Sequence, residues 1–358
     1  MQTVKQPGFD PHKLNLAKKV LEHHVQTRTT PGAVGLVLRR EIVVTSWAVG
    51  NHTYDTNAPT VQPDTLYDLA SVTKAFTTTL CMLFVHKGHL NLDAPVQSYV
   101  PTFQGTNKNL VTPRHLLAHC SGLPAHLHLY KKYNNRDTIL NAVTQLPLAS
   151  EPGTETAYSD MGFLLLGIIL ETISGSRLDH LVKQHILDPL QMNDTCYCPS
   201  SDLKDRIPPT ENITNLRDGL VHGEVHDENA AAMGGIASHA GLFSTAPDLA
   251  LFLQAWLGQS FFPPQGIQQF TTRANIVSQS TWALGWDTVS SQGSSTGHHF
   301  TEKSFGSLGF TGTSIWADPV QNLGVILLTN RVHPTRNNTQ IKHLRPEFHD
   351  AISEALSS

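Results

Sequence analysis

Strand-forming segments lie near the two ends of this 358-residue chain, and a long helical stretch separates them. Two Val-rich segments near the start, 32–39 and 42–50, flank the polar pair at 40–41, which is typical of a β-hairpin. Further strand segments are expected at 282–286, 304–310, 314–317 and 323–328. Strands need partners for their backbone groups, so we expect both sets to join one antiparallel sheet.

The chain is therefore predicted to be an α+β protein in two lobes. Residues 1–70 and 280–358 would form the sheet lobe, and residues 71–279 would be inserted as a mostly helical lobe with the active site between the two. Terminal helices are expected at 10–28, where Asp10-Pro11 is a helix-start signal, and at 341–356. Helices of the inserted lobe are expected at 71–86, 113–119, 137–145, 160–174, 178–186 and 248–257.

Composition excludes several classes of function. The net charge is −4 and no Lys/Arg run occurs, so no nucleic-acid partner is expected. The longest apolar run, 161–170, is half of the roughly 20 residues that a bilayer requires, so no membrane span is expected. The first 25 residues lack an apolar block, and four cysteines are too few for a disulfide scaffold, which favours a cytoplasmic location. The sequence does not indicate an oligomeric state.

A serine and a lysine three residues apart, Ser71 and Lys74, open the first helix of the inserted lobe. Residues three apart share one face of a helix, so the two side chains can meet. A serine is a weak nucleophile until a base takes its proton, and a desolvated lysine whose pKa falls can be that base. Tyr158, just before the apolar helix at 160–174, can share a proton with Lys74. The alternatives are an N-cap serine with a solvated lysine, and a tyrosine that only caps a helix.

Six segments in this order form one set of motifs. They are Asp68-Leu-Ala-Ser71-Val-Thr-Lys74, His115-Leu-Leu-Ala-His119-Cys-Ser-Gly-Leu-Pro124, Pro152-Gly-Thr-Glu-Thr-Ala-Tyr158-Ser-Asp160, Val225-His-Asp-Glu-Asn-Ala230, His239-Ala-Gly-Leu-Phe-Ser-Thr245 and Gly309-Phe-Thr-Gly312-Thr-Ser. From about residue 31 to 334 the chain resembles the serine beta-lactamase-like hydrolases, which include class C beta-lactamases, D-alanyl-D-alanine carboxypeptidases and esterases. The last three segments look most like the N-acetylmuramyl-L-alanine amidase-type branch, whose members trim cell-wall muropeptides.

The resemblance implies further site residues. The backbone N–H groups of Ser71 and Phe310 would form the oxyanion hole. Asp160 stands where the family usually has Asn. A carboxylate there can accept a hydrogen bond from Lys74 but cannot donate one to a substrate carbonyl.

The third motif of the family, usually Lys-Thr-Gly or His-Thr-Gly, is altered in this chain. Its equivalent is Ser307-Leu308-Gly309, which has lost both the cation and the hydroxyl. In the family that cation helps to bind a substrate carboxylate and to depress the tyrosine pKa. A competing register begins at Lys303 and restores the cation, but it places Phe305 where glycine belongs.

Twenty histidines raise the question of a metal site. His115 and His119 are four residues apart on an expected helix, a spacing that suits zinc. Near them lie Cys120, His126 and His128. Metal-free members of the family share this segment, so no metal is expected. Candidates for the pocket wall are His226, Asp227 and His239, which would otherwise hydrogen-bond the loops of the polar region 200–245.

Together these residues predict a serine hydrolase that works through an acyl-enzyme without a cofactor. Ser71 would attack a carbonyl, Lys74 and Tyr158 would carry the proton, and water would release the acyl group. The expected substrate is a small molecule or muropeptide with an amide bond. A carboxylesterase of small acyl esters is the alternative, because the lost cation should weaken binding of carboxylate-bearing peptides. A non-catalytic binding protein on the same scaffold is the alternative from another class.

Overall fold

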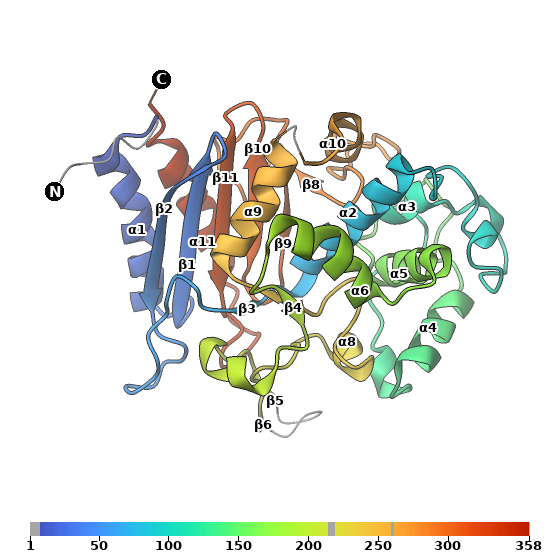
Figure 1. Ribbon diagram of the computed structural model, residues 1–358, viewed down its shortest axis with the longest axis horizontal. Coiled ribbons are helices and arrows are strands. Elements are labelled where there is room, and N and C mark those ends of the chain that lie inside the picture. The colour runs from blue at the N-terminus through green and yellow to red at the C-terminus, as the bar shows by residue number, and fades with distance from the viewer. Residues whose placement is uncertain (1–7, 214–218, 259–260, 358) are drawn as a thin grey trace.

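A computed structural model describes residues 8–213, 219–258 and 261–357 of the chain. Its centre is a six-stranded antiparallel sheet with the strand order β2-β1-β11-β10-β9-β8 (Figure 1). The strands are β1 (Gly32–Arg39), β2 (Ile42–Gly50), β8 (Asp287–Thr288), β9 (Phe305–Leu308), β10 (Ser314–Asp318) and β11 (Leu323–Thr329). The pairing of β1 with β11 joins the start of the chain to its end, so the predicted α+β fold is confirmed.

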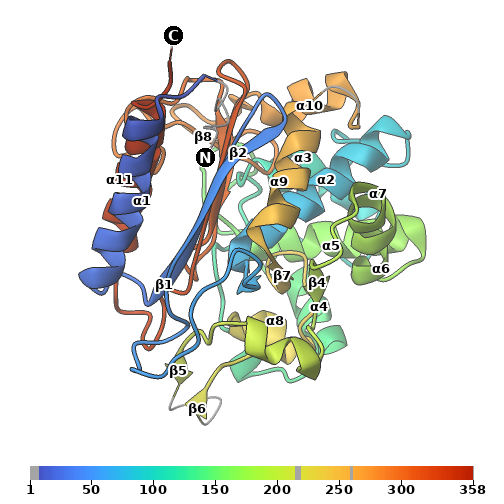
Figure 2. The same ribbon diagram turned by 60° about the vertical axis from the view of Figure 1, so that its left-hand side comes forward.

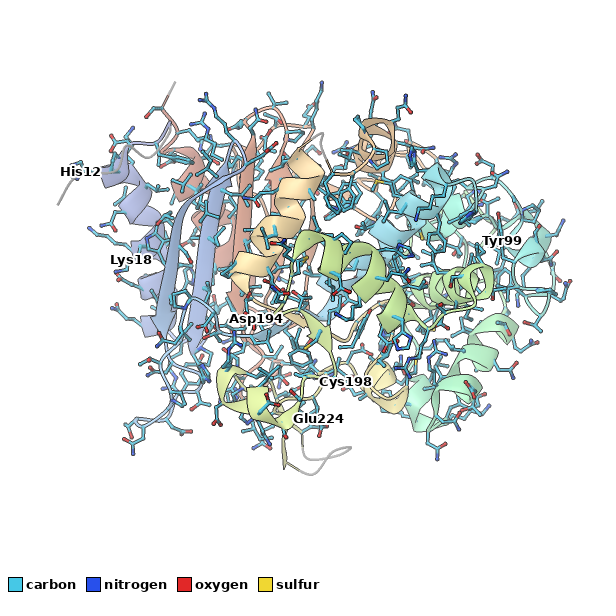
Figure 3. All side chains as sticks on the ribbon, in the orientation of Figure 1. His12, Lys18, Tyr99, Asp194, Cys198 and Glu224 are labelled. Atoms are coloured by element: carbon cyan, nitrogen blue, oxygen red, sulfur yellow. The ribbon has the colours of Figure 1, made fainter. Side chains whose placement is uncertain are left out.

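Two terminal helices, α1 (Pro11–Gln26) and α11 (Ile341–Ser353), cover one face of this sheet (Figure 2). Asp10 caps α1, because its carboxylate accepts hydrogen bonds from the backbone N–H groups of the first turn. The apolar stripe of α1 is buried against the sheet, whereas Lys18 points away from it (Figure 3). Amphipathic periodicity thus decides which side of α1 meets the sheet.

A helix from the middle of the chain, α9 (Ala246–Leu257), covers the opposite face (Figure 2). It contacts β1, β10 and β11, and it also packs on α2 (Thr73–His86), where Phe76 and Phe252 stack with ring centroids 4.3 Å apart. α2 is buried on nearly every side, as expected of a helix without a polar face. The division into a sheet lobe (1–70 and 280–358) and a helical lobe (71–279) stays a prediction. By its contacts, however, α9 packs with the sheet although it lies within 71–279.

The other helices gather beyond α2 (Figure 1). They are α3 (Pro113–Leu117), α4 (Arg136–Gln145), α5 (Asp160–Ser174), α6 (Leu178–Val182), α7 (Asp188–Leu190), α8 (Glu228–Ala232) and α10 (Pro264–Thr271), and a π-helical turn (Lys183–Leu187) follows α6. Two small sheets are formed by β3 (Tyr67–Asp68), β7 (Leu242–Ser244) and β4 (Cys196–Tyr197), and by β5 (Asn212–Ile213) and β6 (Gly219–Leu220). Among the described residues, no single helix has the length and apolar character to cross a bilayer. In the described ranges, one pair of helical segments, α5 and Leu178–Leu190, reaches that length and apolar character only when taken together, and the pair is bent by 77°.

The predicted strand at 282–286 is wrong. Gly285 there has a φ of +81°, and its N–H donates to the carbonyl of Leu117, so the backbone turns before β8 begins. A Cβ on Gly285 would lie 2.0 Å from Oγ1 of Thr78, so close packing on α2 requires glycine. The large apolar residues of this segment fill the core and the active site instead of alternating along a strand.

Candidate active site

The candidate nucleophile Ser71 lies in a single 3-10 turn, Ala70–Val72, that leads into α2. Ala70 has a φ of +45°, a left-handed conformation that costs a non-glycine residue about 1–3 kcal/mol. The buried carboxylate of Asp68 holds this turn, because it accepts hydrogen bonds from the Ala70 N–H at 2.8 Å and the His226 N–H at 2.6 Å. Ser71 itself is half-buried and remains reachable from solvent.

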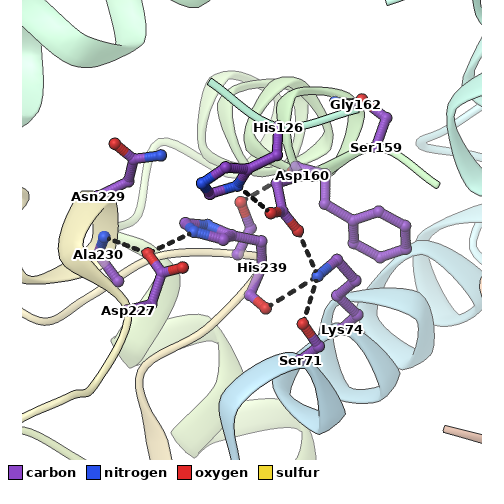
Figure 4. Close-up of polar contacts among 12 residues, drawn as sticks. Ser71, Lys74, His126, Ser159, Asp160, Gly162, Asp227, Asn229, Ala230 and His239 are labelled. Carbon is purple, nitrogen blue, oxygen red and sulfur yellow. Dashed lines mark hydrogen bonds and ion pairs between the residues drawn. The ribbon is translucent and has the colours of Figure 1, made fainter. Parts of the chain in front are cut away.

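Lys74 lies one turn further along and is only 2% exposed. Its Nζ donates to Ser71 Oγ at 2.9 Å and to the backbone carbonyl of His239 at 3.2 Å (Figure 4). It also forms an ion pair with Asp160 Oδ1 at 2.7 Å, and it lies 4.7 Å from the ring centroid of Tyr158. The structure therefore brings the three predicted catalytic side chains and Asp160 together, with Lys74 inside the protein rather than in solvent.

Asp160 decides the protonation state of Lys74. Burial alone would lower the pKa of this lysine, but the adjacent carboxylate outweighs burial and holds the Lys74 pKa above its ordinary value. Burial would raise the pKa of Asp160, yet Lys74 and His126, which lies 2.8 Å from Oδ2, hold it far below its usual range. The condition under which Lys74 could act as a base, a lowered pKa, is therefore not met while Asp160 is ionised beside it. The usual Asn would add no charge beside the lysine, whereas Asp160 does.

Tyr158 lies among other aromatic rings. It stacks with Trp282 at a centroid distance of 5.5 Å and an interplanar angle of 27°, and the ring of His119 lies 4.7 Å away. The residue is 39% exposed, but desolvation of its phenol raises the pKa of Tyr158, and the charge of Lys74 only partly offsets this. The phenol is thus protonated at rest and can give a proton beside Lys74.

His119 supports this arrangement and takes no part in a metal pair. α3 ends at Leu117 and His119 has a φ of +54°, so its side chain leaves the helix face that carries His115. Its Nδ1 accepts a hydrogen bond from the Ser159 N–H at 3.0 Å, and burial lowers the pKa of His119 to about 3. His119 is therefore neutral with its proton on Nε2. His115 instead bonds Thr112 at the start of α3, so the two histidines do not share the face that zinc would require.

The end of β9 forms the opposite wall of the site. A Cβ added to Gly309 would lie 2.5 Å from the carbonyl oxygen of Leu69, so the strand passes very close to the segment that carries the nucleophile. Ser307 and Leu308, the last two residues of β9, are half-buried there. Lys303 is exposed in the turn before β9, at the other end of the strand. The segment beside the nucleophile is thus the one that begins at Ser307, which carries no cation.

The turn after β9 carries the second oxyanion-hole candidate, Phe310. The hydroxyls of Thr311 and Thr313 donate to the backbone carbonyls of residues 68–69, which fastens this turn to the chain just before Ser71. Within the described ranges, neither the Ser71 N–H nor the Phe310 N–H donates to another protein group. Two unused N–H groups on adjoining segments are what an oxyanion hole requires.

Two histidine–carboxylate contacts lie beside the lysine (Figure 4). His239 Nε2 is 3.0 Å from Asp227 Oδ1, and this contact lowers the pKa of Asp227 to about 2 although burial acts against it. His239 is buried and meets Lys74 through its backbone carbonyl rather than its ring. The second pair is His126 with Asp160, in which the histidine side chain is 40% exposed. The helical side of the site thus holds two carboxylates, Asp160 and Asp227, near Lys74.

Sequence reasoning missed the site roles of Asp68, His126 and Trp282. Asp68 opens the Ser71 motif, so its position was a usable signal. The sequence pattern presents His126 only as a neighbour of a possible zinc pair, and it places Trp282 in a strand. Among the candidates for the wall, His226 stacks under the exposed ring of Phe310, with ring centroids 5.6 Å apart.

The sequence profile of the Beta-lactamase family matches residues 17–348. This chain belongs to the beta-lactamase family. It is 33% identical to the N-acetylmuramyl-L-alanine amidase of Bacillus subtilis, over 91% of this chain and 82% of that protein. It is 30% identical to a putative D-alanyl-D-alanine carboxypeptidase of Salmonella typhimurium, over 94% of this chain and 87% of that protein.

Several solved structures share the fold of this chain at low sequence identity. EstCE1, a hydrolase with promiscuous acyltransferase activity, has a TM-score of 0.80 at 19% identity and covers 96% of this chain and 99% of its own. An octameric penicillin-binding protein homologue from Pyrococcus abyssi has a TM-score of 0.77 at 21% identity. The match covers 96% of this chain and 78% of that protein. This beta-lactamase-family chain is a serine hydrolase that acts on an amide or ester through an acyl-enzyme, so the non-catalytic alternative is set aside.

Proposed function

We propose that this beta-lactamase-family enzyme cleaves an amide bond of a muropeptide-type substrate, with Ser71 as the nucleophile. The observation that carries the proposal is the 2.9 Å contact between Ser71 Oγ and Lys74 Nζ. In the proposed reaction Ser71 Oγ bonds to the carbonyl carbon, and the N–H groups of Ser71 and Phe310 hold the developing oxyanion. The C–N bond then breaks, and water hydrolyses the ester left on Ser71.

Lys74 and Tyr158 move the proton in this scheme. Both are protonated at rest, so the reactive form arises when the pair has lost one proton to solvent. The base thus formed takes the proton of Ser71, and the pair later gives a proton to the leaving amine. kcat/KM should therefore rise with pH through the apparent pKa of the pair.

The muropeptide substrate class is supported by the names of the two relatives. One is named an N-acetylmuramyl-L-alanine amidase and the other a putative D-alanyl-D-alanine carboxypeptidase, and each aligns over more than nine-tenths of this chain. A carboxylesterase of small neutral esters is the second candidate. The observation that favours it is the end of β9, where neither Ser307 nor Leu308 can pair with a substrate carboxylate.

We also infer that the enzyme works in a reducing compartment such as the cytoplasm. Its four cysteines, Cys81, Cys120, Cys196 and Cys198, are all free thiols. A reducing environment is where such thiols persist without disulfides.

A labelling experiment tests the nucleophile, and a product assay tests the substrate class. A fluorophosphonate probe should attach to Ser71, as located by mass spectrometry, and Ser71→Ala should abolish labelling. The same variant should cut hydrolysis of p-nitrophenyl acetate by roughly 10⁴-fold or more. N-acetylmuramyl-L-alanyl-D-isoglutamine should yield a free dipeptide amine with the wild type only. A folded Ser71→Ala enzyme with most of its activity would contradict the mechanism, and ester cleavage without amide cleavage would favour the esterase.

A further inference from the structure

The site lacks a hydrogen-bond donor at the position where the family usually has Asn. Asp160 is ionised, and each of its oxygens already faces a cationic or N–H partner, with Lys74 Nζ at 2.7 Å and His126 Nδ1 at 2.8 Å. A carboxylate can only accept hydrogen bonds. A substrate carbonyl on the acyl side of Ser71 therefore finds no donor on Asp160 itself.

His126 is the next polar side chain beyond Asp160, along the line of contacts that starts at Ser71 (Figure 4). It lies in the loop after α3, its side chain is 40% exposed, and its ring meets that of His128 edge-on at 5.1 Å. In the part of the chain that the structure describes, no protein group hydrogen-bonds its Nε2. One nitrogen is thus fixed by Asp160, and the other is open to a ligand.

We propose that His126 is the specificity-determining donor of this site, and that its Nε2–H binds a carbonyl on the acyl chain of the substrate. The inference rests on the proposed function, because it places the acyl group on Ser71. It differs from that function by assigning substrate selection to a side chain outside the catalytic set. Asp160 would act as the positioning residue that fixes the ring, much as a carboxylate orients a catalytic imidazole.

The donor should exist only in one protonation state of His126. Asp160 can only accept, so Nδ1 always carries a proton, and Nε2 carries one only in the imidazolium. The hydrogen bond to Asp160 raises the pKa of His126 although burial acts against it. The charged and titratable groups around the ring are Asp160 from α5 with Lys74 of α2 behind it, Asp227 and Glu228 from the start of α8, His239, and His128 on the same loop. Carbonyl recognition is therefore expected below the pKa of His126 and lost as the pH rises through it.

Two esters that differ by one carbonyl isolate this contact. p-Nitrophenyl 4-oxopentanoate carries a second carbonyl on its acyl chain, and p-nitrophenyl pentanoate does not. The wild type should prefer the oxo ester in kcat/KM by roughly tenfold at low pH, which is the size of one charge-assisted hydrogen bond. This ratio should fall toward one as the pH rises. General effects on Lys74 or on folding change both esters and cancel in the ratio.

Variants separate the contact from its surroundings. His126→Phe should abolish the preference and its pH dependence, whereas the matched His128→Phe should keep both. His126→Phe combined with Asp160→Asn should regain part of the preference without the pH dependence, since an amide donates at every pH. An equal ratio in wild type and folded His126→Phe would overturn the inference. A wild-type ratio that does not change with pH would also overturn it, and that measurement needs no variant. A wild type that neither hydrolyses the esters nor is labelled at Ser71 would instead overturn the proposed function.

Discussion

The two walls of the active site differ in how they are built. The helical wall, from α2, α5 and the loop after α3, presents Lys74, Asp160 and His126 in one line of contacts of 2.7–2.8 Å beyond Ser71. The strand wall, from the end of β9 and the turn after it, presents a backbone N–H at Phe310 and two uncharged β9 side chains, with the guanidinium of Arg331 bonded to the Phe310 carbonyl behind them.

This difference indicates where substrate selection resides. In relatives with an intact third motif, a cation stands on the strand and an amide on the helical side. Here the strand has lost its cation, and the helical side has gained a carboxylate that recruits the exposed His126. β9 itself thus carries no charge beside the nucleophile, and the positive charge of the strand wall lies further back, on Arg331 and Arg336 against the Phe310 ring. Three experiments test whether the two walls differ in their contribution to catalysis and substrate selection.

The largest effect is expected from the lysine–tyrosine pair of the helical wall. Lys74→Ala and Tyr158→Phe should each lower kcat/KM for p-nitrophenyl acetate by about 10³-fold or more, because both handle the same proton. The double variant should lose little beyond either single one. Losses that multiply would show separate roles. Lys74→Ala leaves the Asp160 charge without its cation, so the same comparison in an Asp160→Asn background, with unfolding temperatures measured, serves as the control.

A smaller effect, opposite in sign, is expected at Asp160. Its carboxylate is the main group that holds the Lys74 pKa up against burial, so Asp160→Asn leaves burial opposed chiefly by Tyr158 and lets that pKa fall. The rising limb of kcat/KM against pH should then move to lower pH, and turnover of p-nitrophenyl acetate at pH 7 should increase, by about tenfold for each unit of displacement. Asp227→Asn removes a carboxylate that contacts His239 rather than the one that pairs with Lys74, so it should move the limb much less. A limb that stays in place would mean that Lys74 does not set it.

The smallest effect is expected on the strand wall. Ser307→His returns a titratable cation to the end of β9, so it should raise kcat/KM for penicillin relative to p-nitrophenyl butyrate by roughly tenfold at pH 6. The wild type should strongly favour the butyrate, since an unpaired buried carboxylate is costly. Lys303→Ala is the matched control and should leave the ratio unchanged. A wild type that already hydrolyses penicillin well, and loses this in Lys303→Ala, would restore the competing register.

Local sequence patterns specified much of the fold. Strand segments at the two ends, the cap at Asp10 and the apolar runs of α2 and α5 depend on neighbours a few residues away, and they formed close to where the patterns indicate. The strand predicted at 282–286 is wrong because that prediction, too, used only neighbouring residues. Its apolar side chains look like a strand locally, but the close approach of Gly285 to α2 bends the backbone.

The sequence by itself determined the set of reactive groups, because Ser71 and Lys74 lie one helical turn apart and their meeting needs no distant partner. Tertiary structure alone decided their state. The Lys74 pKa depends on burial and on Asp160, 86 positions further along the chain, and opposing contributions of similar size cannot be balanced without distances. The contact of His126 with Asp160, which leaves Nε2 of the histidine open, likewise exists only in the folded chain. The same holds for the approach of Gly309 to Leu69, because the fold brings these remote segments within a few ångströms.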